Sequence, residues 1–155
     1  MNKVYYTWQD IDSQIKKLLI ALKNDDWQPD LLVGVIRGGS IPAVWMSNIT
    51  GIKTDMINVS FRDNTVKHPH LPVTFLKKVS QYDFKTLIVE DINDTGETLM
   101  WIQDRIKEYK PDISDAVKYA ALIDNQASNF KDLNYKAETI NKDLDPAWIV
   151  FPWEV

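Results

Sequence analysis

With 155 residues, 45% hydrophobic and 26% charged, this chain has the size and composition of one ordinary globular domain, and we expect a single domain over residues 1–155. The net charge of −4 and the scattered Lys and Arg residues argue against a nucleic-acid partner, because neutralising phosphates requires clustered basic side chains. The absence of cysteine excludes disulfides, thiolate chemistry and Cys-based zinc sites. No apolar run reaches membrane-spanning length and the first residues lack a signal-peptide core, so we expect a cytoplasmic protein without a membrane partner.

The first predicted element is an amphipathic helix that follows Thr7. Asp10, three residues later, completes a capping box with that threonine. Five apolar residues then recur at helical spacing: Ile11, Ile15, Leu18, Leu19 and Leu22. Residues 24–26 (NDD) end the pattern, so the stripe predicts a helix that packs its apolar face on a core.

Next comes a strand followed by a tight loop and a second helix. Residues 31–36 are continuously apolar, which is typical of a strand buried on both faces. The loop of residues 37–40 (RGGS) leads to a helix that begins at Ile41-Pro42, and Gly51 is a natural residue to end it.

The second half of the chain continues this alternation. Residues 62–73 contain two prolines and two histidines without periodicity, and we expect a mobile loop there. Residues 98–109 carry apolar residues on one helical face. Five further segments are predicted strands: residues 56–61, 87–89, 117–123, 135–140 and 148–151.

Strands that alternate with helices predict an α/β fold with a mainly parallel central sheet flanked by helices. In such folds ligands bind outside the carboxyl ends of strands. Two loops follow predicted strands in this way: Arg37-Gly38-Gly39, and residues 90–98. We therefore expect them to form two walls of one site.

The second of these loops combines an anion-binding turn with carboxylates. Residues 94–98 (DTGET) lie between a strand and a helix, where backbone N–H groups and two threonine hydroxyls suit a phosphate. The pair Glu90-Asp91 could bind sugar hydroxyls, or share a Mg²⁺ with substrate phosphates. Phosphoribosyl diphosphate (PRPP) carries a phosphate, vicinal hydroxyls and a diphosphate, so it would use all these groups. Arg37 and the glycines after it offer a guanidinium and Cβ-free backbone to its diphosphate.

Three segments resemble those of a known family. LIVEDINDTGETL (residues 87–99) resembles the PRPP-binding signature of type I phosphoribosyltransferases, and Ile36-Arg37-Gly38-Gly39 with Ile41-Pro42 resembles their diphosphate loop. WIVFPWE (residues 148–154) is similar to the C-terminal segment of small bacterial xanthine-guanine and related 6-oxopurine phosphoribosyltransferases. The resemblance implies the type I phosphoribosyltransferase fold, with a short C-terminal hood over the base at about residues 135–155.

That resemblance also implies an activity: Mg²⁺-dependent transfer of ribose 5-phosphate from PRPP to guanine, xanthine or hypoxanthine, with release of diphosphate. It implies that Glu90 and Asp91 bind the ribose hydroxyls, with Asp91 also near Mg²⁺. Asp94 would lie beside the purine N7 as general base or proton carrier. Members of the family suggest a homodimer or homotetramer.

The remaining roles implied by the resemblance concern the two phosphate groups and the base. Asp94, Thr95, Gly96, Glu97 and Thr98 would hold the 5′-phosphate, mainly through backbone amides. Arg37, Gly38 and Gly39 would hold the diphosphate, with a non-proline cis peptide at the Arg37–Gly38 junction. Trp148 would stack on the base, and the Ile149 backbone would contact its edge.

One departure from the family concerns the base. The 6-oxopurine enzymes place a Lys after the fourth strand to contact the purine O6, and here that strand runs into Asp124-Asn125-Gln126. Asn125 is the positional equivalent, with Asp124 and Gln126 one residue away; an amide can donate to O6 but brings no charge. Two alternatives therefore stay open: transfer to another nitrogenous acceptor, and a PRPP- or nucleotide-sensing regulator without turnover.

Overall fold

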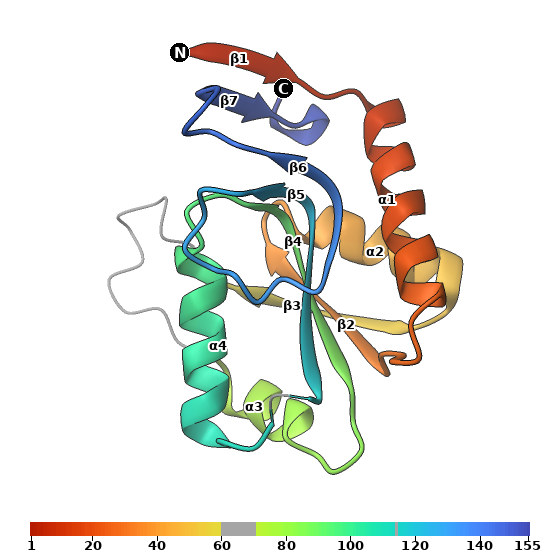
Figure 1. The fold of residues 1–155 in the computed structure, drawn as a ribbon. Coiled ribbons are helices and arrows are strands. Elements are labelled where there is room, and N and C mark those ends of the chain that lie inside the picture. Colours follow the sequence, from red (N-terminus) through yellow and green to blue (C-terminus); the bar gives the residue numbers. More distant parts are fainter. Residues whose placement is uncertain (60–70, 114) are drawn as a thin grey trace.

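The computed structural model describes residues 1–59, 71–113 and 115–155. Within these ranges one sheet has five strands, and every neighbouring pair is parallel, in the order β3-β2-β4-β5-β6 (Figure 1). The strands are β2 (Leu31–Ile36), β3 (Lys53–Asn58), β4 (Thr86–Asn93), β5 (Val117–Asn125) and β6 (Tyr135–Ile140). The predicted fold class, α/β with a mainly parallel central sheet flanked by helices, is confirmed.

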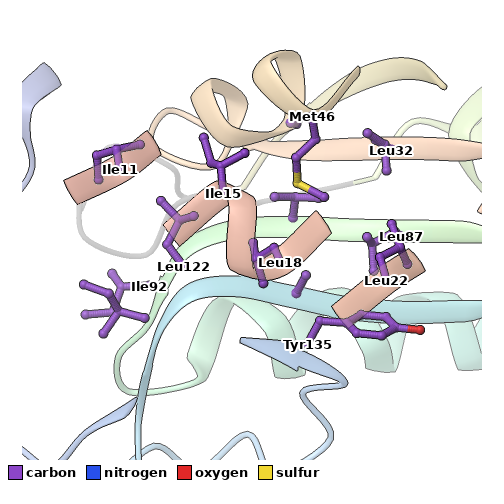
Figure 2. Packing of buried hydrophobic residues seen from close by; sticks show 14 of the residues in the cluster. Ile11, Ile15, Leu18, Leu22, Leu32, Met46, Leu87, Ile92, Leu122 and Tyr135 are labelled. Carbon is purple, nitrogen blue, oxygen red and sulfur yellow. The ribbon is translucent and has the colours of Figure 1, made fainter. Parts of the chain in front are cut away.

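Helices cover both faces of this sheet (Figure 1). One face carries α1 (Trp8–Lys23) and α2 (Ser40–Thr50), and the other carries α3 (Val73–Val79) and α4 (Glu97–Tyr109). Figure 2 shows Ile15 and Leu18 of α1 in one cluster with Met46 of α2 and the strand residue Leu122. Because each fully buried aliphatic side chain contributes roughly 1.5–3 kcal/mol, these two cores hold the sheet between its helices.

The central strand β2 shows why its sequence is continuously apolar. Leu32 packs with α1 and α2, whereas Val33 and Val35 pack with α3 and α4. Gly34 allows α2 to approach β2 closely, since a Cβ atom on it would lie 2.8 Å from the Cα of Ser40. The start of α2, and hence the loop before it, is therefore held firmly against the sheet.

A second, two-stranded parallel sheet joins the two ends of the chain (Figure 1). It pairs β1 (Asn2–Tyr5) with β7 (Ala147–Val150), and β7 leads to the 3₁₀ turn η1 (Pro152–Glu154). We call β1, β7 and η1 together the hood. The rings of Phe151 and Trp153 stack with centroids 4.6 Å apart, and Trp153 also contacts Trp8 at 6.0 Å. These aromatic contacts fasten the hood to the start of α1.

Several local predictions are confirmed. Both β2 and β6 have the predicted bounds. Thr7 and Asp10 form the predicted capping box, and Gly51 ends α2 with a φ of 75°. Among the described residues no helix is both long enough and apolar enough to cross a membrane.

Other local predictions need correction. β4 extends through Asn93, because both its faces stay buried, so the acidic pair belongs to the strand itself. Residues 135–140, a predicted strand within the segment expected to form the hood, pair as the edge strand of the central sheet. β1 and α3 had not been predicted. The predicted mobile loop of residues 62–73 lies outside the described residues up to position 70, and its last residue, Val73, begins α3.

Candidate active site

The two predicted loops lie against each other where the carboxyl ends of the sheet's strands are found. They follow β2 and β4, which are hydrogen-bonded parallel neighbours, so their carboxyl ends face the same way. A Cβ atom on Gly38 would lie 1.8 Å from Oδ2 of Asp91, and one on Gly39 would lie 2.3 Å from the carbonyl oxygen of Val89. Only glycines allow this approach, which brings the loop after β2 directly onto the acidic strand end.

Within the first loop, Arg37 is exposed and Gly39 is buried. The Gly39 N–H donates to the carbonyl of Val35 at 2.9 Å, which closes the turn back onto β2. A non-proline cis peptide joins Ile36 to Arg37, one bond before the predicted junction. The guanidinium is therefore presented to solvent from a turn whose base is fixed.

The acidic pair lies in the last half of β4, before the buried residues Ile92 and Asn93. Asp91 is 9% exposed, and its Oδ1 accepts a hydrogen bond from the Ile92 N–H at 2.7 Å, while Oδ2 lies toward Gly38. Glu90 is half-buried, and its Oε1 accepts from the Asp91 N–H at 3.1 Å. Carboxylate oxygens at this place suit hydroxyl groups or a hard cation that also binds a diphosphate.

The turn before α4 requires a glycine at position 96. Gly96 takes a φ of 91°, and a Cβ atom on it would lie 2.5 Å from the backbone nitrogen of Phe130. α4 begins at Glu97, so the N–H groups of its first turn have no intrahelical acceptor and face outward. Thr95 and Glu97 are exposed and Thr98 is half-buried. These amides belong to the segment that the sequence predicted to hold the phosphate.

A buried polar cluster supports this turn. Asn93, 1% exposed, donates to Oδ1 of Asp124 at 2.9 Å and accepts from the Ser128 hydroxyl at 2.8 Å. The Asn129 N–H donates to the carbonyl of Thr95 at 2.9 Å. Asn93 and Ser128 were missed from the sequence, because polar residues beside a turn carry no signal of which distant segment they bind. Both side chains are buried and their hydrogen bonds tie the end of β4 to residues 124–130.

Asn125, the predicted equivalent of the missing Lys, has its hydrogen-bonding groups engaged within the protein. Its Nδ2 donates to the carbonyl and Oδ1 of Asp94 at 3.1 and 3.3 Å. Its Oδ1 accepts from the backbone N–H groups of Ala127 and Lys142 at 3.2 and 3.0 Å. Since the residue is also 5% exposed, its side chain orients Asp94 in this structure.

A lysine from another segment reaches the same carboxylate. Nζ of Lys142, between β6 and β7, lies 2.9 Å from Oδ2 of Asp94. The two side chains are only 19% and 24% exposed. Nothing in the sequence singled out Lys142, because it lies 48 residues from Asp94 and in no motif.

The hood residues predicted to contact a base lie on opposite sides of β7. Trp148 is 48% exposed, whereas Ile149 is buried at 8% and packs into the core beneath α1. The alternation of the strand therefore turns the indole away from the core and the Ile149 side chain into it.

Comparison with known proteins identifies the family. The family described as a phosphoribosyl transferase domain matches residues 1–155. The chain belongs to the phosphoribosyltransferase family. A hypoxanthine-guanine phosphoribosyltransferase of Streptococcus pyogenes is 31% identical over 129 residues, which cover 80% of this chain and 69% of that protein. A xanthine-guanine phosphoribosyltransferase of Idiomarina loihiensis is 26% identical over 125 residues, covering 80% and 70%.

Solved structures agree with this assignment. The crystal structure of a purine phosphoribosyltransferase from Pyrococcus horikoshii superposes with a TM-score of 0.72 at 31% identity, covering all of this chain and 96% of that one. The resemblance read from the sequence is thereby confirmed, and it makes this phosphoribosyltransferase a pentosyltransferase enzyme. The roles of individual site residues stay predictions.

Proposed function

We propose that this phosphoribosyltransferase transfers ribose 5-phosphate from PRPP to a 6-oxopurine base (guanine, xanthine or hypoxanthine) and releases diphosphate. The observation that carries the proposal is the direct contact between Gly38 and Asp91, which joins a diphosphate loop to the acidic strand end. The names of the relatives, hypoxanthine-guanine and xanthine-guanine phosphoribosyltransferase, support the class of base.

Each part of PRPP has a matching group at this edge of the sheet. The amides of residues 95–98 take the 5′-phosphate at the start of α4, where the helix dipole favours negative charge. Glu90 and Asp91 accept from the ribose hydroxyls, and the exposed guanidinium of Arg37, with the backbone of Gly38 and Gly39, takes the diphosphate. One loop therefore holds the anion through amides and the sugar through carboxylates.

The family generally uses Mg²⁺, and the acidic strand end fits that ion. Asp91 offers a hard oxygen ligand whose Oδ2 lies toward the diphosphate loop. Among the described residues no group of three His, Asp or Glu side chains forms a metal site by itself. When bound, Mg²⁺ stabilises the negative charge of the departing diphosphate.

The residues of the chain also account for the chemical step. The bond between ribose C1 and the diphosphate oxygen breaks, and both of its electrons leave with the diphosphate. The positive charge that develops on the sugar is stabilised by the nearby carboxylates of Glu90 and Asp91. A purine ring nitrogen then bonds to C1, and the base loses one proton. Asp94 lies beside N7, where its carboxylate takes up or relays that proton.

Incubating the protein with PRPP, Mg²⁺ and a panel of bases tests the proposal. We expect one nucleoside monophosphate and one diphosphate for each base consumed, with guanine, xanthine or hypoxanthine as the best acceptor. If product forms only with other bases, the result would favour transfer to another nitrogenous acceptor. Tight PRPP binding without product from any base would favour a sensing regulator and contradict the enzyme.

The assembly state and location are further parts of this proposal. We propose a homodimer or homotetramer in the cytoplasm. Val44 and Ile49 of α2 are apolar side chains that are 43% and 57% exposed, and they offer surface that a second copy could cover. Sedimentation equilibrium would give the number of copies, and a monomer at micromolar concentration would contradict the proposed assembly.

A further inference from the structure

The base end of the proposed site holds a cation that the motif does not provide. Lys142 lies in the connection between β6 and β7, and its Nζ is 2.9 Å from Oδ2 of Asp94. The backbone N–H of Lys142 donates to Oδ1 of Asn125 at 3.0 Å, so the main chain as well as the side chain is fixed at this point. Asp94, Asn125 and Lys142 therefore form one connected group.

Other charged groups near the end of β5 are engaged elsewhere. Lys136 lies 2.9 Å from Oδ2 of Asp124, and Lys131 donates to the carbonyl of Gln126 at 2.7 Å. The Asn125 amide is engaged on both its atoms, as described above. Lys142, by contrast, contacts Asp94, and its ammonium retains further donor capacity.

The chemistry of the base explains why this position matters. In a 6-oxopurine, N7 and O6 are neighbouring acceptors on the same edge of the ring. If Asp94 lies beside N7, an ammonium group 2.9 Å from its Oδ2 is within reach of that edge of the ring. The Lys142 ammonium has three donors, and one bond to Asp94 leaves two for the ligand.

We propose that Lys142 donates to O6 of the bound base, in place of the lysine absent at Asn125, and thereby selects 6-oxopurines over 6-aminopurines. This inference rests on the proposed function and names the residue that sets its base preference. A 6-aminopurine would place an amino donor against the ammonium donor in a pair of side chains that are only 19% and 24% exposed. The mismatched donors would lose the hydrogen bond and remain poorly hydrated.

The test compares variants on two bases. Lys142→Met keeps the aliphatic length and removes the charge, Lys142→Arg keeps a cationic donor, and Lys136→Met is the matched control because it removes a lysine from the adjacent ion pair. For each protein we would measure kcat/KM with hypoxanthine and adenine, and the affinities for inosine and adenosine monophosphate. Lys142→Ala replaces the Met variant if that variant does not fold.

We expect Lys142→Met to lower the hypoxanthine-to-adenine ratio about 10- to 100-fold, as expected for the loss of one hydrogen bond to a charged group. The ratio of the two nucleotide affinities should fall with it, Lys142→Arg should recover part of both ratios, and Lys136→Met should change neither. A purely structural role through Asp94 would weaken both bases equally.

Equal losses for both bases, or no loss, would overturn the inference while leaving the proposed function intact. If the wild-type protein forms no nucleotide but still binds inosine monophosphate, the affinity ratios alone decide the inference. If it forms no nucleotide and binds neither monophosphate, the proposed function fails and the inference fails with it.

Discussion

Replacing Gly38 by alanine adds one methyl group at the place where the two loops of the site meet. The new Cβ would lie 1.8 Å from Oδ2 and 2.4 Å from Cγ of Asp91. Ordinary contact begins near 3.4 Å, so the two groups must separate by ~1.6 Å. The carboxylate cannot simply rotate away at no cost, since its Oδ1 accepts from the Ile92 N–H at 2.7 Å.

The displacement sets the expected magnitude. A shift of about 1 Å in a positioning group can lower a rate on the order of 100-fold, so we expect Gly38→Ala to lower kcat/KM for PRPP by at least that factor. Overpacking of a folded site typically costs about 1–3 kcal/mol, which leaves a domain of this size folded. Activity should therefore fall far more than stability.

Gly51→Ala is the matched control. Gly51 has a left-handed backbone with a φ of 75°, and a Cβ atom on it would meet nothing within 4 Å. We expect a loss of about 1–2 kcal/mol from the left-handed backbone alone, with unchanged kcat/KM. The assay is steady-state nucleotide formation at varied PRPP, together with thermal unfolding of both variants.

A double variant tests the contact between Gly38 and Asp91 directly. Asp91→Ala removes the atoms that clash with the new methyl group, so the two substitutions should be non-additive in kcat/KM. If Gly38→Ala kept wild-type kcat/KM and unfolding temperature, or if its effect added fully to that of Asp91→Ala, the close contact between the two loops would be refuted.

Three further predictions concern the base and the packing of the chain. Asp94→Asn should lower kcat about 10²- to 10⁴-fold while PRPP affinity stays near wild type in a direct titration; an equal loss of both would contradict its role toward the base. Trp148→Ala should raise KM for the base by roughly 5- to 100-fold with little change in unfolding temperature, because the indole is half exposed. Trp153→Ala loses a stacked ring, so it should cost more than ~1 kcal/mol of stability and leave KM for the base nearly unchanged. The Tyr135 hydroxyl, with smaller contributions from the Trp27 N–H and Lys118, lowers the pKa of Asp25. The Asp25 carboxylate therefore stabilises the fold above the ordinary carboxyl range of about pH 4, and this contribution is lost as the pH falls through its folded pKa. Tyr135→Phe should make the loss of stability with falling pH less steep in that range, and an unchanged pH profile of unfolding would contradict the assignment.

The parts of this fold that the sequence predicted are those set by local pattern. Residues 31–36 are apolar throughout because β2 is buried on both faces, and the stripe of α1 follows its capping box. The meeting of the two loops was also predictable, since a parallel sheet sends the carboxyl ends of its strands to one edge. The order of strands then makes β2 and β4 neighbours.

The parts that the sequence did not predict depend on pairing across long stretches of chain. β1 is short and exposed along its whole length, so it has no alternation, and it exists because Asn2 pairs with Ala147. The position of Lys142 at the site also depends on distant parts of the chain. Its contact with Asp94 comes from the return of the chain after β6, and no spacing within either segment specifies it.

A crystal structure with guanosine monophosphate and Mg²⁺ would be the most direct test of the proposed nucleotide site, because a single ligand would have to reach both loops and the base end together. We predict the phosphate on the amides of residues 95–98, the ribose hydroxyls on Glu90 and Asp91, and the guanine against Trp148 with N7 beside Asp94. A nucleotide whose phosphate lies away from that turn, or whose base lies on the far side of the sheet from the hood, would contradict it.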